Sequence, residues 1–358
     1  MSTPGTPSTP RTPRTPLRVG LIGYGLAGSV FHAPLIAATE GLVLDTIVTS
    51  RPVKEFPDVT TVASPDDLWP RAAELDLIVI ASPNRTHVPL ATAALEAGLP
   101  VVVDKPLAGT AAEARALAAL AQERGLLLSV FQNRRWDNDF RTLRSLIDAG
   151  ELGTVQRFES RFERWRPQPK GGWRESGDPE EIGGLLYDLG SHLVDQALTL
   201  FGPALQVYAE VDIRRPGAEV DDDSFIALTH AGGVRSHLWM SATTALLGPR
   251  FRALGSAAGY VKYGLDPQEA ALRDGLRPGP GSPGWGTEPP SAWGHLGAGD
   301  STRPVPTLPG DYPAYYAAIA RALRDGTPSP VTALEAAAAL DVLEAARVSA
   351  GEGRTIVL

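Results

Sequence analysis

The sequence has 358 residues, a formal net charge of −8 and no cysteine. The length predicts two domains, and 43% hydrophobic with 21% charged residues indicates a globular chain that can bury a large core. The acidic balance argues against nucleic acid or an anionic membrane as a partner, and the lack of cysteine excludes disulfides, thiolate nucleophiles and cysteine-based metal sites. No apolar run approaches the ~20 residues of a membrane span, so we expect a cytoplasmic protein.

Residues 1–16 form a Thr-Pro repeat with a period of three that contains Arg11 and Arg14. A low-complexity segment of this kind cannot supply a packed core, so we expect a disordered or polyproline-like tail. The predicted fold therefore begins at Leu17.

The first chemical motif is a glycine turn. An apolar run of strand length, 17–23, leads into Gly23-Tyr24-Gly25-Leu26-Ala27-Gly28 and then into a predicted helix. Gly23 permits a tight turn, Gly25 lets the backbone approach a pyrophosphate, and Gly28 lets the helix pack on the strand. The phosphates would lie at the helix N-terminus, where free N–H groups attract negative charge. The strand before and the helix after favour a dinucleotide site over a coincidental glycine turn.

The second predicted strand, 42–48, ends in Thr49-Ser50-Arg51. An NAD site usually has Asp or Glu there, which binds the ribose 2′-hydroxyl. Asp45 comes too early in the strand for that role, whereas the hydroxyl of Ser50 and the guanidinium of Arg51 suit a 2′-phosphate. The pattern favours NADP(H) as the cofactor, with NAD(H) as the alternative, unless Arg51 is simply a solvated surface residue.

Strands and helices then alternate, which predicts a doubly wound parallel sheet and a Rossmann domain over residues 17–133. The predicted strands are 75–81, 101–103 and 126–131, and the predicted helices are 86–97 and 111–124.

Two polar clusters fall where such sheets bind ligands, beyond the carboxyl ends of the strands. The first, 83–87, contains Asn84 and His87, which we assign to the cofactor site; capping of the next helix is the alternative for this cluster. The second is Asp104-Lys105-Pro106. A cation held at a strand end points into the cofactor crevice, so Lys105 is a candidate for both binding and catalysis.

The pattern changes in residues 134–358, which we assign to a substrate-binding and oligomerisation domain. Consecutive strands without helices between them predict an α/β domain with an open, mostly antiparallel sheet. Residues 276–310 hold eight prolines and eight glycines, which predicts a long irregular segment. The elements expected here are a helix ended by Gly150, strands at 155–165, 206–213, 224–229, 234–241 and 251–253, helices at 312–325 and 333–350, and a strand at 354–358.

A glycine pair, Gly183-Gly184, leads into a predicted helix that carries Asp188 and His192. Residues four apart project from the same side of a helix, and Asp195 is predicted to hold the His192 ring. A carboxylate and an imidazole aimed together can move a proton near neutral pH. The alternative is an Asp placed for the helix dipole and a histidine that only fills the core.

Together these motifs resemble the Gfo/Idh/MocA oxidoreductase family, over residues 17–358. The shared features are the glycine turn, Asp104-Lys105-Pro106 where the family usually has Glu-Lys-Pro, and Asp188-x-Gly190-x-His192. Stretches such as 31–36 and 133–140 are similar to the NADP-dependent scyllo-inositol dehydrogenase branch. Asp104 has a shorter side chain than the Glu of the family motif, so we expect it to affect how Lys105 is held.

The resemblance implies hydride transfer between a nicotinamide and a secondary alcohol or ketone of a cyclic polyol, of the scyllo-inositol type, or of a sugar. It also implies a homodimer or homotetramer formed through the open sheet. The residues it places at the nicotinamide end of the cofactor are Asn133, Trp173, Arg174 and Tyr312.

The chemistry of the candidate catalytic residues agrees with that role. His192 can accept the hydroxyl proton, Lys105 can stabilise negative charge on the oxygen, and Asp188 can bind neighbouring hydroxyls and tune His192. The cofactor supplies the redox step, and the residues predict no metal.

Two other functions stay open at this point. One is a same-fold reductase of another carbonyl substrate, such as an aldose, a deoxy-sugar ketone or a linear tetrapyrrole. The other is a non-catalytic, cofactor-sensing regulatory protein. The presence of Lys105, Asp188 and His192 together argues against a sensor, which needs none of the three.

Overall fold

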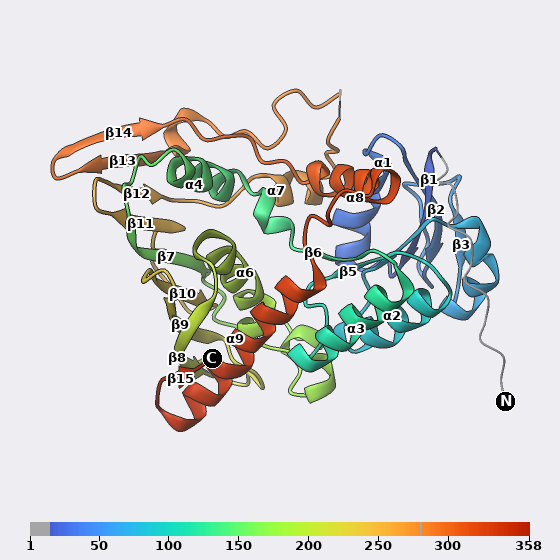
Figure 1. Ribbon diagram of the computed structural model, residues 1–358, viewed down its shortest axis with the longest axis horizontal. Coiled ribbons are helices and arrows are strands. Elements are labelled where there is room, and N and C mark those ends of the chain that lie inside the picture. The colour runs from blue at the N-terminus through green and yellow to red at the C-terminus, as the bar shows by residue number, and fades with distance from the viewer. Residues whose placement is uncertain (1–14, 280) are drawn as a thin grey trace.

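The computed structural model describes residues 15–279 and 281–358, so the predicted Thr-Pro tail falls outside it except for its last two residues. Two sheets stand beside each other, with helices between and around them (Figure 1). The first sheet lies on the right of that view, near the N-terminus, and the second on the left. Within the described ranges, no helix combines the length and the apolar character needed to cross a bilayer.

The first sheet has six strands in the order β3-β2-β1-β4-β5-β6, and every neighbouring pair is parallel. Its central strands are runs of Val, Ile and Leu buried on both faces, as expected for a sheet covered by helices on each side. The strands are β1 Leu17–Ile22, β2 Leu42–Val48, β3 Thr60–Val62, β4 Leu77–Ile80, β5 Val101–Asp104 and β6 Leu128–Phe131. The doubly wound parallel sheet is therefore confirmed; β3 was not among the predicted strands.

Helices follow the strands as the alternation predicts. After β1 the chain forms a π-helical turn, Ala27–His32, that continues into α1, Ala33–Ala37. The next helices are α2, His87–Glu96, and α3, Ala111–Arg124. α3 starts where the sequence places it because Thr110 and Glu113 form a capping box.

The second sheet has nine strands in the order β14-β13-β12-β11-β7-β10-β9-β8-β15. Among its described strands all neighbouring pairs are antiparallel except β10 with β7. The mostly antiparallel sheet is confirmed. Its strands are β7 Val155–Glu163, β8 Ala204–Asp212, β9 Asp223–His230, β10 Arg235–Ser241, β11 Phe251–Gly255, β12 Gly259–Lys262, β13 Gly294–Ala298, β14 Ser301–Val305 and β15 Ile356–Val357.

The prediction of an irregular 276–310 segment is wrong at its centre, where β13 and β14 form a hairpin. Glycine is required where the two strands of this hairpin approach closely: a Cβ on Gly297 would collide with the backbone of Ser301. Pro304 is tolerated because β14 is an edge strand. The short strand β12 and helix α7, Gln268–Arg273, were also not predicted.

Helices cover the inner face of the second sheet. They are α4 Asn138–Asp148, α5 Leu185–Asp188, α6 Gly190–Phe201 and α9 Ala333–Glu352. The remaining helix, α8 Pro313–Asp325, returns to the first sheet, where it packs beside α1 (Figure 1). Phe158 and Phe162 of β7 point into the helical layer.

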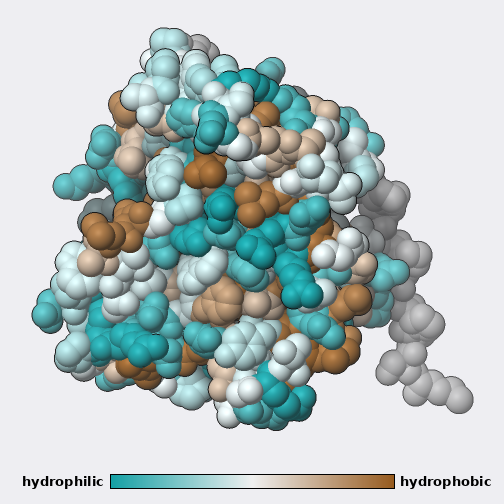
Figure 2. Space-filling view, turned by 90° about the vertical axis from the view of Figure 1, so that its left-hand side faces the viewer, coloured by the Kyte–Doolittle hydropathy of each residue, from teal (hydrophilic) through white to brown (hydrophobic). Residues whose placement is uncertain are grey.

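In the part of the chain that the structure describes, no helix covers the other face of the second sheet, and residues of β9 alternate between buried and half-buried. The side of the molecule that carries this sheet mixes hydrophilic and hydrophobic patches (Figure 2). Phe225, His237 and Trp239 gather on the open face, and the Arg161 guanidinium lies 3.9 Å from the centre of the Trp239 ring.

Candidate active site

The glycine turn after β1 has the shape of a dinucleotide cradle. Gly23 has φ 98°, and a Cβ there would lie 2.7 Å from the carbonyl oxygen of Ala81. A Cβ on Gly28 would collide with the carbonyl oxygen of Gly23, so close packing requires both glycines. A Cβ on Gly25 would meet nothing within 4 Å. The open space beside Gly25, at the start of the helix, fits a pyrophosphate.

The end of β2 presents Ser50 and Arg51 to solvent. The backbone N–H of Arg51 donates to Thr49 Oγ1 at 3.0 Å, while its guanidinium has no partner within the described chain. Asp45 is engaged by Arg18 and Arg71, so it does not compete for a ribose at this edge.

A crevice of about 610 Å³ lies between the two domains, and both supply its walls. Lys105 follows β5 and Asn133 follows β6, both at the carboxyl edge of the first sheet. Asp188 ends α5, and His192 lies in the first turn of α6. The structure thus brings the three predicted catalytic residues into one cavity.

Lys105 is held by Asp188. Its Nζ lies 2.9 Å from Asp188 Oδ1 and also donates to the Asp188 backbone oxygen. Asp104, the residue that departs from the family motif, accepts a hydrogen bond from the Lys105 backbone N–H instead. Burial by itself would raise the pKa of Asp188, but Lys105 and Arg174 hold it below its ordinary value, so this carboxyl group is ionised.

His192 is a neutral imidazole with a defined tautomer. Its Nδ1 lies 3.0 Å from Gln132 Oε1, an amide oxygen that only accepts, so Nδ1 carries the hydrogen and Nε2 carries a lone pair. The ring is 6% exposed. Burial, followed by the charges of Lys105 and Arg134, holds the pKa of His192 well below its ordinary value. The imidazole can therefore accept a proton at neutral pH.

Two details of the predicted His192 helix are wrong. The helix is interrupted at Leu189, with α5 ending at Asp188 and α6 beginning at Gly190. Asp195 does not hold the His192 ring; both its carboxylate oxygens accept from Arg135, at 2.7 and 2.8 Å. The guanidinium fork offers a carboxylate two parallel hydrogen bonds, which a single ring N–H cannot match.

Gln132 takes the orienting role, and the motif search missed it. The signal was its position immediately after the strand predicted to end at Phe131, at the same sheet edge as Lys105. Parallel strands end together at that edge, so the Gln132 side chain reaches the His192 ring behind the crevice wall.

Three of the residues expected at the nicotinamide end line two neighbouring hollows. Asn133 and Arg174 line the crevice, and the Arg174 guanidinium stacks 4.1 Å from the centre of the Trp173 ring. Trp173 and Arg174 also line a small hollow that reaches Lys105 and Asp188, and the predicted cofactor-site residue Asn84 lines this hollow too. These four residues stay predicted cofactor contacts.

His87 and Tyr312 lie beneath the surface of the site. The ring nitrogens of His87 lie 2.7 Å from the Pro106 carbonyl oxygen and 3.0 Å from that of Ser82, so the ring links two strand ends. Tyr312 is 0% exposed, and its hydroxyl donates to Asp137 Oδ1 at 2.7 Å and accepts from Arg134. Neither side chain lines the crevice, and direct cofactor contact stays a prediction for both.

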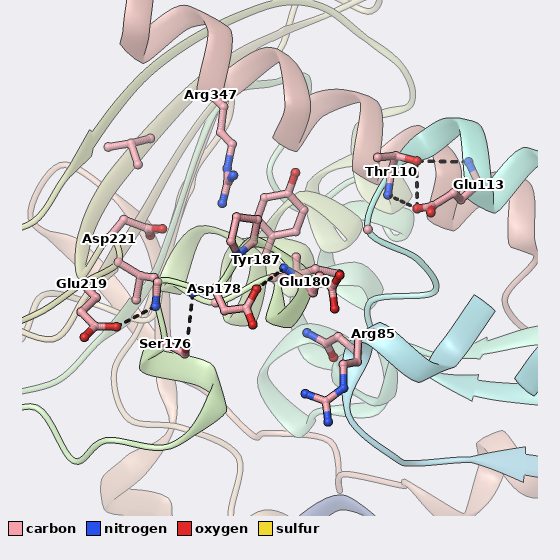
Figure 3. Close-up of a pocket in the computed structure, with 18 of the residues that line it drawn as sticks. Arg85, Thr110, Glu113, Ser176, Asp178, Glu180, Tyr187, Glu219, Asp221 and Arg347 are labelled. Carbon is pink, nitrogen blue, oxygen red and sulfur yellow. Dashed lines mark hydrogen bonds between the residues drawn. The ribbon is translucent and has the colours of Figure 1, made fainter. Parts of the chain in front are cut away.

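A second and larger hollow, the outer groove, has a volume of about 970 Å³. One segment divides it from the crevice: residues 170–175 contribute to the crevice and residues 176–183 to the outer groove. Arg347 reaches from α9 toward the Tyr187 ring, and Arg85 lies on the other side of the hollow (Figure 3). Within residues 15–279 and 281–358, no group of three or more His, Asp or Glu is arranged to hold a metal.

Family models match both domains. Residues 17–132 match the oxidoreductase family with an NAD-binding Rossmann fold, and residues 140–261 match the GFO/IDH/MocA C-terminal domain.

The curated relatives extend over nearly the whole chain. The uncharacterized oxidoreductase YdgJ of Escherichia coli K12 is 44% identical, covering 96% of this chain and 99% of its own. The scyllo-inositol 2-dehydrogenase (NADP⁺) IolW of Bacillus subtilis 168 is 38% identical, covering 96% of both.

Among solved structures, the putative oxidoreductase yvaA from Bacillus subtilis superposes with a TM-score of 0.91 at 37% identity, covering 97% of this chain and 100% of that one. The Yersinia pestis putative oxidoreductase YPO2259 superposes with a TM-score of 0.89 at 40% identity, covering 98% and 99%. With the glycine cradle and the crevice residues, these matches show that the chain belongs to the Gfo/Idh/MocA oxidoreductase family and is an NAD(P)-dependent dehydrogenase.

Proposed function

We propose that this dehydrogenase uses NADP(H) and transfers hydride to or from a secondary alcohol or ketone of a cyclic polyol, of the scyllo-inositol type, or of a sugar. The observation that carries the proposal is the crevice arrangement: a neutral His192 with a free Nε2 lines the same cavity as the Lys105–Asp188 ion pair. The name of IolW, an NADP-dependent scyllo-inositol dehydrogenase, supports the same substrate class.

The residues divide the work of alcohol oxidation. A carbon cannot lose hydride easily while its hydroxyl keeps the proton, so His192 Nε2 accepts that proton. Lys105 faces the oxygen as it gains negative charge, and Gln132 keeps the imidazole in the accepting tautomer. Asp188 keeps Lys105 in place and accepts hydrogen bonds from neighbouring hydroxyls. The bound nicotinamide supplies the acceptor for the hydride.

The choice of NADP(H) rests on the end of β2. The guanidinium of Arg51 is free to pair with a 2′-phosphate, and Ser50 offers a hydroxyl beside it. Asp45, the acidic residue within β2, is engaged by two arginines.

The test is turnover by the purified full chain with scyllo-inositol, myo-inositol and a panel of sugars, each with NADP⁺ and with NAD⁺, followed by the absorbance of the reduced cofactor. We expect oxidation of at least one cyclic polyol or sugar, with NADP⁺ preferred. Activity only on another carbonyl substrate would contradict the substrate class. Tight NADPH binding without turnover of any substrate would support the sensor instead.

We further propose a homodimer or homotetramer formed through the open face of the second sheet. The aromatic cluster of Phe225, His237 and Trp239 supports this assembly because half-buried rings on an uncovered sheet face gain from burial. Light scattering after size exclusion should give two or four times the chain mass, and Trp239→Glu should lower it. A monomer at micromolar concentration would contradict the proposal.

A further inference from the structure

The crevice holds more positive charge than its own carboxylates neutralise. Seven Lys or Arg side chains line it, against four Asp or Glu. Glu269 pairs with Arg134 and Arg273, and Asp188 pairs with Lys105 and Arg174. Glu175 is engaged by Arg215, and Asp104 by the Lys105 backbone and His32. The crevice residues Arg164, Arg166 and Lys170 are left without a carboxylate partner within the described chain.

The geometry of the chain after β7 places two of these cations on the side of the crevice, where Arg164 is half-buried and Arg166 is exposed. Backbone pairing continues past the end of the strand, with the N–H groups of Arg164 and Arg166 donating to Ser241 and Ala242 at 2.9 and 2.8 Å. Alternate residues of an extended chain share a side. The Phe162 ring packs 6.3 Å from that of His192, so residues 162, 164 and 166 face the catalytic histidine. Trp165, between the two arginines, is 58% exposed.

Arg164 is half-buried, and its guanidinium makes no direct ion pair or hydrogen bond within the described chain. Burial and the adjacent charge of Arg166 lower the pKa of Arg164, the more remote Asp188 and Glu269 oppose this by raising it, and Arg134 adds a further repulsion. Placing like charges together in a partly desolvated cavity costs free energy unless an anion joins them. A neutral polyol offers no such charge.

We infer that the substrate of this crevice carries an anionic group, a carboxylate or a phosphate, which Arg164 and Arg166 bind while its hydroxyl faces His192. This inference rests on the proposed hydride transfer and narrows its substrate to sugar acids or phosphorylated sugars and polyols. Guanidinium groups suit this task because they bind carboxylate and phosphate oxygens in pairs. Lys170, farther along the same wall, adds charge without fixed geometry.

The cofactor is a second source of anionic groups. Leu26 and Ala27, at the glycine turn, line the crevice as well, so a bound pyrophosphate shares this cavity. The two sources differ in a measurable way. Arginines that serve the substrate leave the affinity for NADPH unchanged when they are replaced.

The experiment compares probes that differ by one charged group. The full chain saturated with NADP⁺ is titrated calorimetrically with D-glucose, D-glucuronate and D-glucose 6-phosphate, at low and at high salt. The variants are Arg164→Gln and a matched control, Arg157→Gln. Arg157 is exposed on the opposite face of the same strand, and its guanidinium has no partner in the described chain, so the control removes the same charge away from the crevice. NADPH affinity is measured for each protein by fluorescence titration.

We expect the native chain to bind glucuronate or glucose 6-phosphate at least about tenfold more tightly than glucose, because charged hydrogen bonds to a guanidinium are strong. High salt and Arg164→Gln should remove most of this preference, while Arg157→Gln and the NADPH affinity of both variants stay unchanged. Equal or undetectable binding of all three probes overturns the inference, as does a preference that survives Arg164→Gln. A loss of NADPH affinity in Arg164→Gln assigns the arginines to the cofactor and also overturns it. If the enzyme turned over neutral polyols as fast as their anionic counterparts, the proposed hydride transfer would stand and only the inference of an anionic substrate would be overturned.

Discussion

The crevice and the outer groove lie on two sides of the segment 170–183, yet the charged groups that line them differ in how many have partners. The outer groove is larger, and five of its lining side chains are carboxylates. Four of those five acids bind the chain itself: Glu113 caps α3, Glu219 accepts from the Gly177 N–H, Asp178 caps a short turn and Asp221 accepts from the Leu186 N–H.

The crevice is smaller, but several of its polar groups lack partners within the described chain. His192 Nε2 has no hydrogen-bond partner within the described chain, and three cations there lack carboxylates. The comparison teaches that volume is a poor guide to the active site of this fold. Groups that the chain leaves available for a ligand identify it better.

The largest effect should follow the loss of the proton acceptor. His192→Asn should lower kcat about 10²–10⁴-fold, the usual range for a positioned acid–base group. A buried histidine elsewhere, His230, hydrogen-bonds through its ring to Gly202 and Ser236, so His230→Asn should lower the melting temperature and spare kcat. Measuring kcat and melting temperature for both variants checks this. A His192→Asn protein that keeps kcat within a few-fold would make His192 a core residue.

Loss of the crevice lysine should come next. Lys105→Met should cost about 10²–10³ in kcat, because Lys105, held by Asp188, is the cation that we assign to the developing charge on the oxygen. NADPH affinity should change only a few-fold, since the lysine makes only part of the cofactor contact. Lys54→Met, an exposed change in the same domain, is the control. If kcat were unchanged in Lys105→Met, a group other than Lys105 would stabilise the negative charge on the oxygen.

The cofactor end should respond more weakly. Arg51→Gln should reduce the preference for NADPH over NADH more than tenfold, since a charge-assisted contact contributes roughly 1.5–3 kcal/mol. Titration of both cofactors measures it, with kcat at saturating cofactor as the control. If the native chain binds NADPH and NADH equally, the end of β2 does not select the cofactor.

The pH dependence should reflect the environment of His192. A histidine whose folded pKa is lowered stays neutral through its ordinary value of about 6.5, and becomes protonated only at lower pH. Oxidation kcat/KM should therefore hold steady as pH falls through that value and decline below it. The stability linked to neutral His192 follows the same sign: it is present above the ordinary pKa and is lost as pH falls toward the folded pKa. A decline of kcat/KM centred at the ordinary value would mean that His192 is not buried in the working enzyme.

The smallest effect should come from the outer groove. Arg347→Gln removes an exposed cation 4.7 Å from the Tyr187 ring, an interaction of about 0.5–1 kcal/mol. We expect a small decrease in melting temperature and a change in kcat/KM of less than about twofold. A tenfold loss of kcat/KM would give the outer groove a catalytic role.

The fold of the first domain was easier to predict from the sequence than the contacts within the candidate active site. The parallel sheet followed from continuous apolar runs, and the start of α3 from a local capping box. Lys105, Asp188 and His192 were identified because their motifs are short and local. The β13–β14 hairpin was missed because glycine and proline content resembles a loop, whereas pairing between distant segments decides the outcome.

The partners of the site residues were harder to predict than the residues themselves. Asp195 is close to His192 in sequence, but Arg135 competes for it more effectively. Gln132 reaches the His192 ring from the end of β6, and Arg164 reaches the crevice from the chain after β7, so no local spacing connects them with His192. Contacts of this kind depend on tertiary packing.

A crystal structure of the full chain grown with NADPH tests the central claim most directly, because it shows which hollow receives the cofactor. The account predicts electron density for the pyrophosphate beside Gly25 and for the nicotinamide ring in the crevice beside Lys105 and His192, with the outer groove empty. A dinucleotide bound in the outer groove between Arg85 and Arg347, or a nicotinamide ring remote from Lys105, would contradict it.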